Sequence, residues 1–354
     1  MTDSNQGAPA WRFPAEWEAQ SAVLIAWPHA GTDWAERLPS VEGTYAALVA
    51  AITRFEACLL LVPDERVLSH ARQVLGAAGV DLARVRFEIL EYDDTWLRDS
   101  GPITLRQGAE RKLLDFHFTA WGGKFEAGRD DRIVAALRQR GVLAAEAYER
   151  IDFALEGGGI ETDGAGTLLT TWRCLHERHP GLGRDQITDR LKAALRQDRV
   201  LWLEHGYLEG DDTDAHIDTL ARFAAPDAIV YQGCDDPSDS HHDELRAMAA
   251  ELAALRTADG KPYRLFELPW PRPVHDGDRR LAASYANFLI VNGAVLMPVY
   301  GDAADARAAA VMAQAFPGRE IVPVPCRPLI WQNGSLHCLT MQLPEGVLAG
   351  VPKC

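Results

Sequence analysis

Several segments that lie far apart in this chain carry residue types that could together perform nucleophilic chemistry. Cys338 lies near the C-terminus, directly after a glycine-containing turn. The other members of the set lie upstream: Asp99, Glu156, His216 and Asp218. A thiolate that attacks a cationic carbon needs carboxylates to hold the cation and an imidazole to move protons. We take these residues as the candidate catalytic set.

Each of these residues also has a more ordinary explanation. A free cysteine such as Cys338 is usually a small buried apolar residue. A lone His-x-Asp pair such as His216 and Asp218 is more often a surface pair or a core histidine with a partner, and carboxylates generally face water. The combination favours catalysis more than any single member does.

A guanidinium group is the target that suits this set best. Its carbon is resonance-stabilised and resists water, so attack needs a soft nucleophile and carboxylates that hold the plane. Asp99 and Asp218 could hold it by bidentate pairing, and the bound cation would favour the thiolate form of Cys338. His216, oriented by Glu156, would protonate the departing ammonia and then take a proton from the attacking water.

The candidates recur at one place in a weak internal repeat of two strands, a turn and a helix. Asp99 and Glu156 precede first strands, whereas His216, Asp218 and Cys338 are expected within them. Since residues i and i+2 of a strand share a face, His216 and Asp218 should point the same way. The predicted strand pairs are Gly159–Thr162 with Thr167–Thr171, His216–Phe223 with Ala228–Tyr231, Tyr285–Val291 with Ala294–Tyr300, Gly101–Leu105 with Lys112–Phe118, and Ser335–Gln342 with Ala22–Trp27.

Amphipathic segments between the strand pairs predict helices on the outside of the fold. They are Gly43–Phe55, Asp64–Gly76, Asp130–Arg140, Arg184–Arg196, Ser240–Leu255 and Ala303–Phe316. No unit of this size could bury its apolar face alone, so the units must stack around a common axis as an α/β propeller. A doubly wound parallel sheet is the alternative, but it predicts no tight hairpins and requires a phosphate loop whose glycine spacing the triplet at 157–159 lacks. We expect one domain over residues 11–354 and a disordered stretch over 1–10.

Composition restricts the function classes. The 354 residues are 47% hydrophobic and 25% charged, and the net charge of −15 disfavours nucleic acid and acidic membrane surfaces while favouring small cations. No signal-peptide pattern and no run of about 18 apolar residues is present, so membrane spanning and export are not expected. The 6 cysteines are widely spaced, which predicts a reducing, cytoplasmic setting. The sequence is silent on oligomeric state, and a homo-oligomer remains open.

Metal and cofactor sites are not predicted. The histidine pairs His241-His242 and His176 with His179 lack acidic or thiol partners at ligand spacing, so we interpret them as surface residues. A nucleophilic serine on a strained elbow turn has no support either. The proposed proton shuttle needs neither metal nor organic cofactor.

In order along the chain, these motifs resemble those of the agmatine deiminases in the guanidino-group-modifying, or pentein, superfamily. The likeness spans almost the whole chain and rests on Pro14–Glu18, Ala26–Pro28, Asp93–Pro102, Ala120–Lys124, Leu155–Gly158, Gly210–Asp218, Arg280–Phe288 and Gly334–Thr340. The resemblance implies a five-bladed α/β propeller built from ββαβ-type repeats around a central active site. It also implies hydrolysis of agmatine to N-carbamoylputrescine and ammonia, within putrescine biosynthesis.

The resemblance implies residue roles as well. Cys338 would form a covalent amidino intermediate and His216 would serve as acid and base, with the three carboxylates around the guanidinium. Trp96 and Trp121 would line the substrate pocket, and Asp212 would meet the distal amine. The chain departs from the family pattern at Asp212, where many members carry glutamate, at Ala215, where they carry glycine, and at 332–335, where they carry a glycine-rich run. These departures bear on substrate length more than on the reaction.

Two other functions remain open. A deiminase of peptidyl-arginine or another arginine derivative would share the guanidinium end of the pocket and differ only where the remainder of the substrate is recognised. A non-catalytic propeller that acts as a binding module would have no reason to keep the nucleophile, the imidazole and the carboxylates together.

Overall fold

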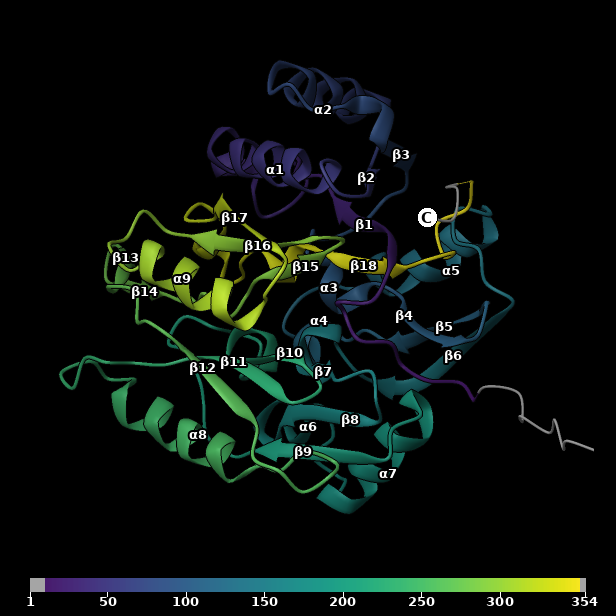
Figure 1. Cartoon of the computed structure of the whole chain (residues 1–354). Coiled ribbons are helices and arrows are strands. Elements are labelled where there is room, and N and C mark those ends of the chain that lie inside the picture. Colours follow the sequence, from purple (N-terminus) through teal and green to yellow (C-terminus); the bar gives the residue numbers. More distant parts are fainter. Residues whose placement is uncertain (1–9, 351–354) are drawn as a thin grey trace, which may run out of the picture.

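The computed structural model describes residues 10–350, and within them the strands form small separate sheets arranged around a centre. Five of these sheets have three or four strands, and the sixth is a two-stranded hairpin. Figure 1 shows the strands converging on the middle of the molecule, with the longer helices on the outside. This arrangement is the predicted α/β propeller, in which each of the five larger sheets is one blade.

The first blade joins the two ends of the described chain. Its strand order is β18–β1–β2–β3, where β18 (Met341–Pro344) pairs antiparallel with β1 (Gln20–Ala26). β1 is followed by the parallel strands β2 (Ala57–Val62) and β3 (Val85–Ile89). Pairing of the last strand with the first closes the ring of blades, and this closure covers sheet edges that would otherwise be free. Figure 1 shows β18 beside β1.

Each of the other four blades repeats an antiparallel pair followed by a parallel third strand. The third strand lies beside the second and returns after a helical segment, so the unit is the predicted ββαβ repeat. The blades are β4 (Ile103–Gln107), β5 (Glu110–His117) and β6 (Ala147–Ala154); β7 (Ile160–Thr162), β8 (Thr167–Thr171) and β9 (Arg199–Leu203); β10 (Ala221–Ala225), β11 (Ala228–Gln232) and β12 (Arg264–Leu268); and β15 (Leu289–Val291), β16 (Ala294–Val299) and β17 (Glu320–Pro325). The extra hairpin is β13 (Val274–Asp276) with β14 (Arg279–Leu281).

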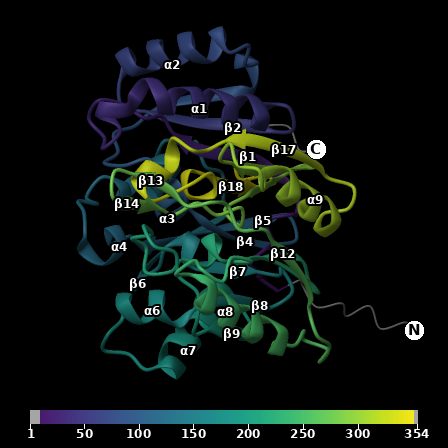
Figure 2. The same ribbon diagram turned by 90° about the vertical axis from the view of Figure 1, so that its left-hand side faces the viewer.

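All six predicted helices are present, with ends shifted by a few residues. They are α1 (Leu38–Thr53), α2 (Glu65–Ala77), α5 (Ile133–Gln139), α7 (Arg184–Leu195), α8 (His242–Ala254) and α9 (Asp305–Ala315). Figure 2 shows α1 and α2 at one end of the molecule and α7 at the other. Three short helices were not predicted: α3 (Leu97–Ser100), α4 (Ala120–Gly123) and α6 (Trp172–Arg178).

Alternate residues of β1 belong to different apolar clusters, which explains why the whole strand is buried. Val23 and Ile25 pack in the cluster that includes residues of α1, whereas Ala22 and Leu24 pack in the cluster that includes Leu97 of α3. A strand covered on both faces reads as a continuous apolar run, as this one does. One face of β1 therefore packs with the outer helix α1, and the other face packs with the short helix α3.

The extent of this domain remains a prediction. The blades form one ring over the described residues, and the expected domain over 11–354 also includes the final residues 351–354, which lie outside them. Of the stretch 1–10 that was expected to be disordered, residues 1–9 likewise lie outside the described residues.

A buried guanidinium ties the N-terminal segment to two blades. Arg222 of β10 is fully buried, and it contacts the carboxylates of Glu16 and Glu161 and the carbonyl oxygen of Phe288. Both carboxylates are also largely removed from water. Because an unpaired charge in such surroundings is costly, each of these groups depends on the others.

Loss of this guanidinium should destabilise the protein severely. We expect Arg222→Met to lower the free energy of unfolding by about 3–5 kcal/mol, because it leaves two buried carboxylates short of a partner. Urea unfolding followed by circular dichroism would measure the change. Arg264→Met is the matched control, since Arg264 pairs with Asp227 on the surface, where ion pairs contribute less than about 1 kcal/mol. Equal effects of the two substitutions would contradict this account.

Candidate active site

The predicted catalytic residues all lie in turns that precede the first strand of a blade. Asp99 is in α3 before β4, and Glu156 precedes the short turn η4 (Gly157–Gly159) before β7. His216 and Asp218 lie at the turn η5 (Ile217–Thr219) before β10, and Cys338 lies in η7 (His337–Leu339) before β18. All of them are buried. The turns converge because equivalent points of the blades surround one axis.

The expectation that His216, Asp218 and Cys338 lie within strands is wrong. Hydrogen bonds between residues three apart turn the chain there, as from the Leu220 amide to the Ile217 carbonyl and from the Thr340 amide to the His337 carbonyl (both 3.0 Å). The strands begin only at 221 and 341. A turn lets successive side chains point to the axis, which an extended strand with alternating faces would not.

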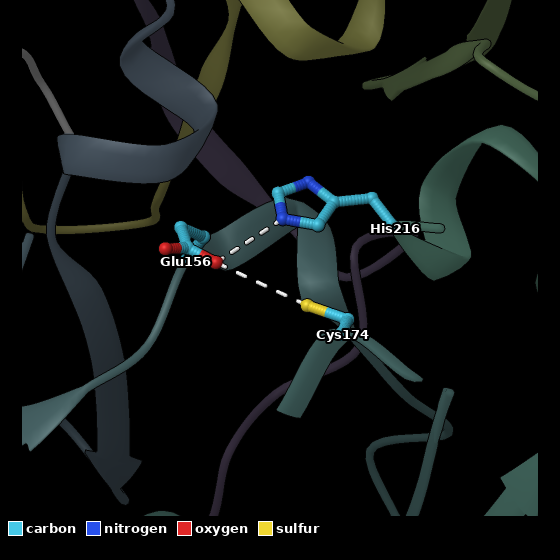
Figure 3. A group of neighbouring side chains, drawn as sticks. All are labelled: Glu156, Cys174 and His216. Carbon is cyan, nitrogen blue, oxygen red and sulfur yellow. Dashed lines mark hydrogen bonds and ion pairs between the residues drawn. The ribbon is translucent and has the colours of Figure 1, made fainter. Parts of the chain in front are cut away.

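His216 lies between two carboxylates. Its Nε2 is 3.2 Å from Oε2 of Glu156, and its Nδ1 is 3.7 Å from Oδ1 of Asp99. Figure 3 shows the imidazole of His216 and the thiol of Cys174 both facing the same oxygen of Glu156, from which the Cys174 sulfur lies 4.0 Å away. Glu156 is held by Arg178, whose Nε donates to both carboxylate oxygens at 2.8 and 2.9 Å.

Cys338 lies beside the carboxylate of Asp218. Its Sγ is 3.8 Å from Oδ2 of Asp218 and 3.4 Å from Oδ1 of Asn287. The same Asn287 oxygen accepts hydrogen bonds from the backbone amides of His337 (2.9 Å) and Cys338 (3.3 Å). Asn287 therefore sets the position of the turn that carries the thiol.

The sequence reasoning missed four residues of this site: Cys174, Arg178, Asn287 and His337. Asn287 had a detectable signal, because it precedes the first strand of the β15–β17 blade, the one blade without a candidate. That position was obscured because Tyr285–Val291 was expected to be extended, whereas the strand covers only Leu289–Val291. Cys174 and Arg178 lie on α6, which was not predicted, and nothing in their spacing pointed to Glu156.

A cavity of about 360 Å³ leads from the surface to Cys338 and Asp99. Its walls include all three predicted substrate-binding residues, Trp96, Trp121 and Asp212. The unpredicted members of the wall are Asp33, Asp94, Phe125, Thr213, Trp331, Gln332, Asn333 and Gly334. Aromatic walls with acidic groups suit an apolar chain that ends in a cation.

The predicted wall residues differ in their contacts. Trp121 donates from Nε1 to Oδ2 of Asp99 at 2.9 Å, so it also orients a candidate catalytic carboxylate. Trp96 packs flat on the backbone of Gly334, where a Cβ atom would lie only 2.4 Å from the ring. Asp212 accepts a hydrogen bond from the side chain of Asn333 at 2.9 Å, and its carboxylate lines the cavity.

Burial and mutual charge shift the titration of these groups. Burial raises the pKa of Asp99 to about 6, with Asp218 adding to the shift and His216 opposing it. Burial alone would lower the pKa of His216, but Asp99 and the neighbouring acids raise it well above the usual value. Burial raises the pKa of the Cys338 thiol well above its usual range, and the adjacent carboxylates add to that effect. These pKa shifts favour an imidazolium at His216 and a protonated thiol at Cys338.

Two buried polar atoms at the centre have no hydrogen-bond partner among the described residues. They are Nδ1 of His216 and Oδ1 of Asp218. Gly158 packs directly against this group, since a Cβ atom there would come within 2.6 Å of His216 Nδ1, 2.8 Å of Asp99 Oδ1 and 3.2 Å of Asp218 Oδ2. Unpaired buried polar atoms are costly, so two of them beside the candidate nucleophile indicate a polar ligand at this centre.

The ligand atoms of Glu156, Cys174 and His216 lie within 4.8 Å of one another, a spacing that a metal ion could use. However, the guanidinium of Arg178 already pairs with both oxygens of Glu156. We therefore assign these contacts to the orientation of His216, and the absence of a metal from the reaction stays a prediction.

Comparisons with known proteins identify the family. The sequence matches the family model of the Porphyromonas-type peptidyl-arginine deiminases over residues 12–344. The chain belongs to this family. An agmatine deiminase of Stutzerimonas stutzeri is 34% identical over 94% of this chain and 95% of its own length. The predicted resemblance is thus confirmed.

Solved structures of relatives share the fold over nearly their whole length. A C. jejuni agmatine deiminase with a cysteine-to-serine substitution and substrate bound is 34% identical, with a TM-score of 0.89 over 98% of this chain and all of its own. A Porphyromonas gingivalis protein, provisionally named an arginine deiminase, is 45% identical, with a TM-score of 0.89 over 96% of this chain and all of its own. The predicted fold class is confirmed.

A side chain at position 158 should remove activity without unfolding the protein. In Gly158→Ala the added methyl group would come within 2.6 Å of His216 Nδ1 and 2.8 Å of Asp99 Oδ1 and so displace these residues, and we expect kcat/KM to fall by about 100-fold or more because displacements near 1 Å have this effect. Steady-state release of ammonia would measure it. Gly43→Ala in α1, where nothing lies within 4 Å of the new Cβ, should leave kcat/KM unchanged. A Gly158→Ala protein with full activity would show that the substrate binds elsewhere.

Proposed function

We propose that this protein is an agmatine deiminase that hydrolyses the guanidinium of agmatine to N-carbamoylputrescine and ammonia. The observation that carries the proposal is the buried group of a thiol, an imidazole and two carboxylates (Cys338, His216, Asp99 and Asp218) at the inner end of the cavity. The cavity above this group has the aromatic walls and acidic groups that a butyl chain with a terminal ammonium would require. The naming of several relatives supports the same substrate.

Substrate binding prepares the nucleophile. A guanidinium between Asp99 and Asp218 would neutralise the carboxylates that keep Cys338 protonated, so the thiol proton passes to bulk water as the cation binds. The thiolate then faces the guanidinium carbon within the clamp. Binding and activation are coupled in this way, since a neutral ligand would not lower the pKa of the thiol.

The first half-reaction releases ammonia. The Sγ atom of Cys338 forms a bond to the guanidinium carbon, and the C–N bond to one terminal nitrogen breaks. The leaving nitrogen takes a proton from His216, which the raised pKa keeps available as an imidazolium. Ammonia departs, and an amidino group remains on the sulfur.

The second half-reaction restores the enzyme. His216, now neutral, takes a proton from water, and the oxygen of that water bonds to the amidino carbon. The C–S bond then breaks and the proton of the added hydroxyl passes to the departing sulfur, so the thiol is regenerated and the ureido product leaves. Glu156 holds the imidazole in place through its contact with Nε2 and is itself fixed by Arg178.

A deiminase of arginine or its derivatives is the second candidate. The family description and the P. gingivalis relative favour it. The acids Asp33, Asp94 and Asp212 on the cavity wall oppose it, because they would repel the α-carboxylate of free arginine. A peptide would need room beyond the wall that Trp331 and Phe125 form.

We also propose a cellular setting for this reaction. Putrescine formation follows from the product, and a cytoplasmic location follows from the widely spaced cysteines. The acidic net charge of −15 favours a small cationic substrate over nucleic acid. None of the helices in the described part of the chain combines the length and the apolar character that a membrane crossing requires. A homo-oligomer is compatible with this function.

Removal of the nucleophile should abolish turnover and leave the fold intact. We expect Cys338→Ser to release ammonia from agmatine at less than about one-thousandth of the original rate, since a serine there lacks a base to ionise it. Ammonia release from agmatine, arginine and a blocked arginine peptide would be compared, and the circular dichroism spectrum would report folding. Cys234→Ser, at a buried thiol remote from the cavity, is the control. Faster turnover of arginine peptides than of agmatine would favour the second candidate.

The affinity for agmatine should weaken in acid. Burial raises the pKa of Asp94 to about 7, and the neighbouring Asp33 and Asp212 add to the shift. The ionised form, which attracts the distal ammonium, is therefore lost as the pH falls through that value. We expect KM for agmatine to rise by up to about 10-fold from pH 8 to pH 6, in inverse proportion to the ionised fraction of Asp94.

The control for this pH effect is butylguanidine, which lacks the distal amine. Its KM should follow only the titration of the guanidinium site, and Asp94→Asn should remove the difference in pH dependence between the two substrates. Identical pH profiles of KM for both substrates in the original protein would contradict the role of Asp94.

A further inference from the structure

His337, the residue before the nucleophile, points away from the cavity and into a buried group of charges. Its Nδ1 lies 2.7 Å from Oδ2 of Asp218, and its Nε2 lies 2.9 Å from Oε2 of Glu16. The imidazole is 1% exposed, Asp218 is fully buried, and Glu16 is 8% exposed. The ring therefore bridges two carboxylates that have almost no access to water.

Each of these two contacts requires a proton on the ring nitrogen that makes it, Nδ1 in one and Nε2 in the other. A neutral imidazole has one N–H, and its other nitrogen would direct a lone pair at a carboxylate oxygen less than 3 Å away. An imidazolium donates to both oxygens at once, and such charge-assisted hydrogen bonds are the short and strong kind observed here.

The charges around the ring balance only when it is protonated. Arg222 contacts Glu16 at 2.7 Å and also pairs with Glu161, and Arg98 lies 3.7 Å from Glu16. The group thus contains three carboxylates and two guanidinium ions, all of them buried. A third cation at His337 makes the group neutral, and a neutral group avoids the cost of an uncompensated buried charge.

We propose that His337 is a positioning residue, held as an imidazolium between Glu16 and Asp218, that keeps Asp218 ionised and presents its free oxygen to the guanidinium. This inference rests on the proposed deiminase reaction. His337 does not touch the substrate, since it lies on the side of Asp218 away from the cavity wall.

Oδ2 of Asp218 contacts both His337 (2.7 Å) and the sulfur of Cys338 (3.8 Å). Oδ1 has no partner among the described residues, so it stays available to a guanidinium N–H. Burial acts to raise the pKa of Asp218, but the hydrogen bond and the charge of His337 lower it below the usual value. Without that cation, Asp218 would take up a proton and lose its attraction for the substrate.

Several ionisable groups on the surrounding elements face His337. Around the ring and its two partners lie Glu16, Arg98, Glu161, Asp218 and Arg222, with Cys338 and His216 on the far side of Asp218. The two guanidinium ions keep their charge at all relevant pH values. Asp94 and Asp99 also contribute to the acid limb, with pKa values of about 7 and 6, but they do not contact His337. A difference in the limb between the original protein and a His337 variant would therefore reflect Asp218.

The decisive experiment is the pH profile of kcat/KM for agmatine in His337→Gln. The amide can donate to one carboxylate but carries no charge, so Asp218 should protonate at higher pH. We expect the acid limb of the profile to move up by at least about one pH unit, and KM near pH 7 to rise by about 10-fold or more. Raising the pH should restore much of the lost kcat/KM. A loss that is uniform across pH, with the limb unmoved, would overturn the proposal.

His241→Gln is the matched control. His241 is also 1% exposed, but it pairs with a single carboxylate, Asp239 (2.8 Å), and lies outside the cavity wall. This substitution should lower the thermal midpoint of unfolding without moving the acid limb. An equal shift of the limb in both variants would show that general destabilisation causes it.

Ring ¹⁵N NMR of the original protein, labelled at histidine, tests the same proposal if His337→Gln does not fold. Because each ring nitrogen of His337 faces a carboxylate oxygen, both should carry a proton at pH 7, and the signal should be assigned by its displacement in Glu16→Gln. An unprotonated nitrogen on this ring at pH 7 would overturn the proposal. The NMR result does not depend on turnover. An original protein that is inactive on agmatine would contradict the proposed function, whereas the NMR measurement would still decide whether His337 is an imidazolium.

Discussion

Charges buried at the centre of the propeller must compensate one another, and the rest of the site depends on this constraint. Arg178 holds Glu156, and His216 lies between Glu156 and Asp99. On the other side, Arg222 and His337 hold Glu16, and His337 holds Asp218. Because a buried charge without a partner costs several kcal/mol, at about 3–5 for a broken pair, these side chains have few alternative positions. The site is therefore organised before a substrate arrives.

These paired charges leave two polar atoms at the centre of the site available to a substrate. Where the two sets of charges meet, His216 Nδ1 and Asp218 Oδ1 have no partner among the described residues, and the missing side chain at Gly158 lets His216, Asp99 and Asp218 lie this close together. Burial raises the pKa of the Cys338 thiol, and the neighbouring carboxylates raise it further, so the thiol stays protonated. A cation bound here supplies missing hydrogen bonds and offsets the effect of the carboxylates on that pKa, so recognition and activation have one physical origin.

The fold could be predicted from the sequence, whereas the local structure around the candidate residues could not. Strand pairs and outer helices follow from local apolar patterns and turn residues, as at Asn292-Gly293 between β15 and β16. Placement of His216, Asp218 and Cys338 within strands was wrong, because short apolar runs do not reveal a turn stabilised by three-residue hydrogen bonds. The same difficulty obscured Asn287, which occupies the equivalent turn of another blade.

The sequence by itself determined the blade pattern, the closing strand and the residue types that could act on a guanidinium, because these depend on periodicity and chemical identity within short segments. Only the tertiary structure decided which charges pair. Arg178 with Glu156, and His337 with both Glu16 and Asp218, are contacts between segments 22 to 321 residues apart. No local pattern encodes such a pairing, since it arises when separate blades bring their turns to one dry centre where every charge needs a partner.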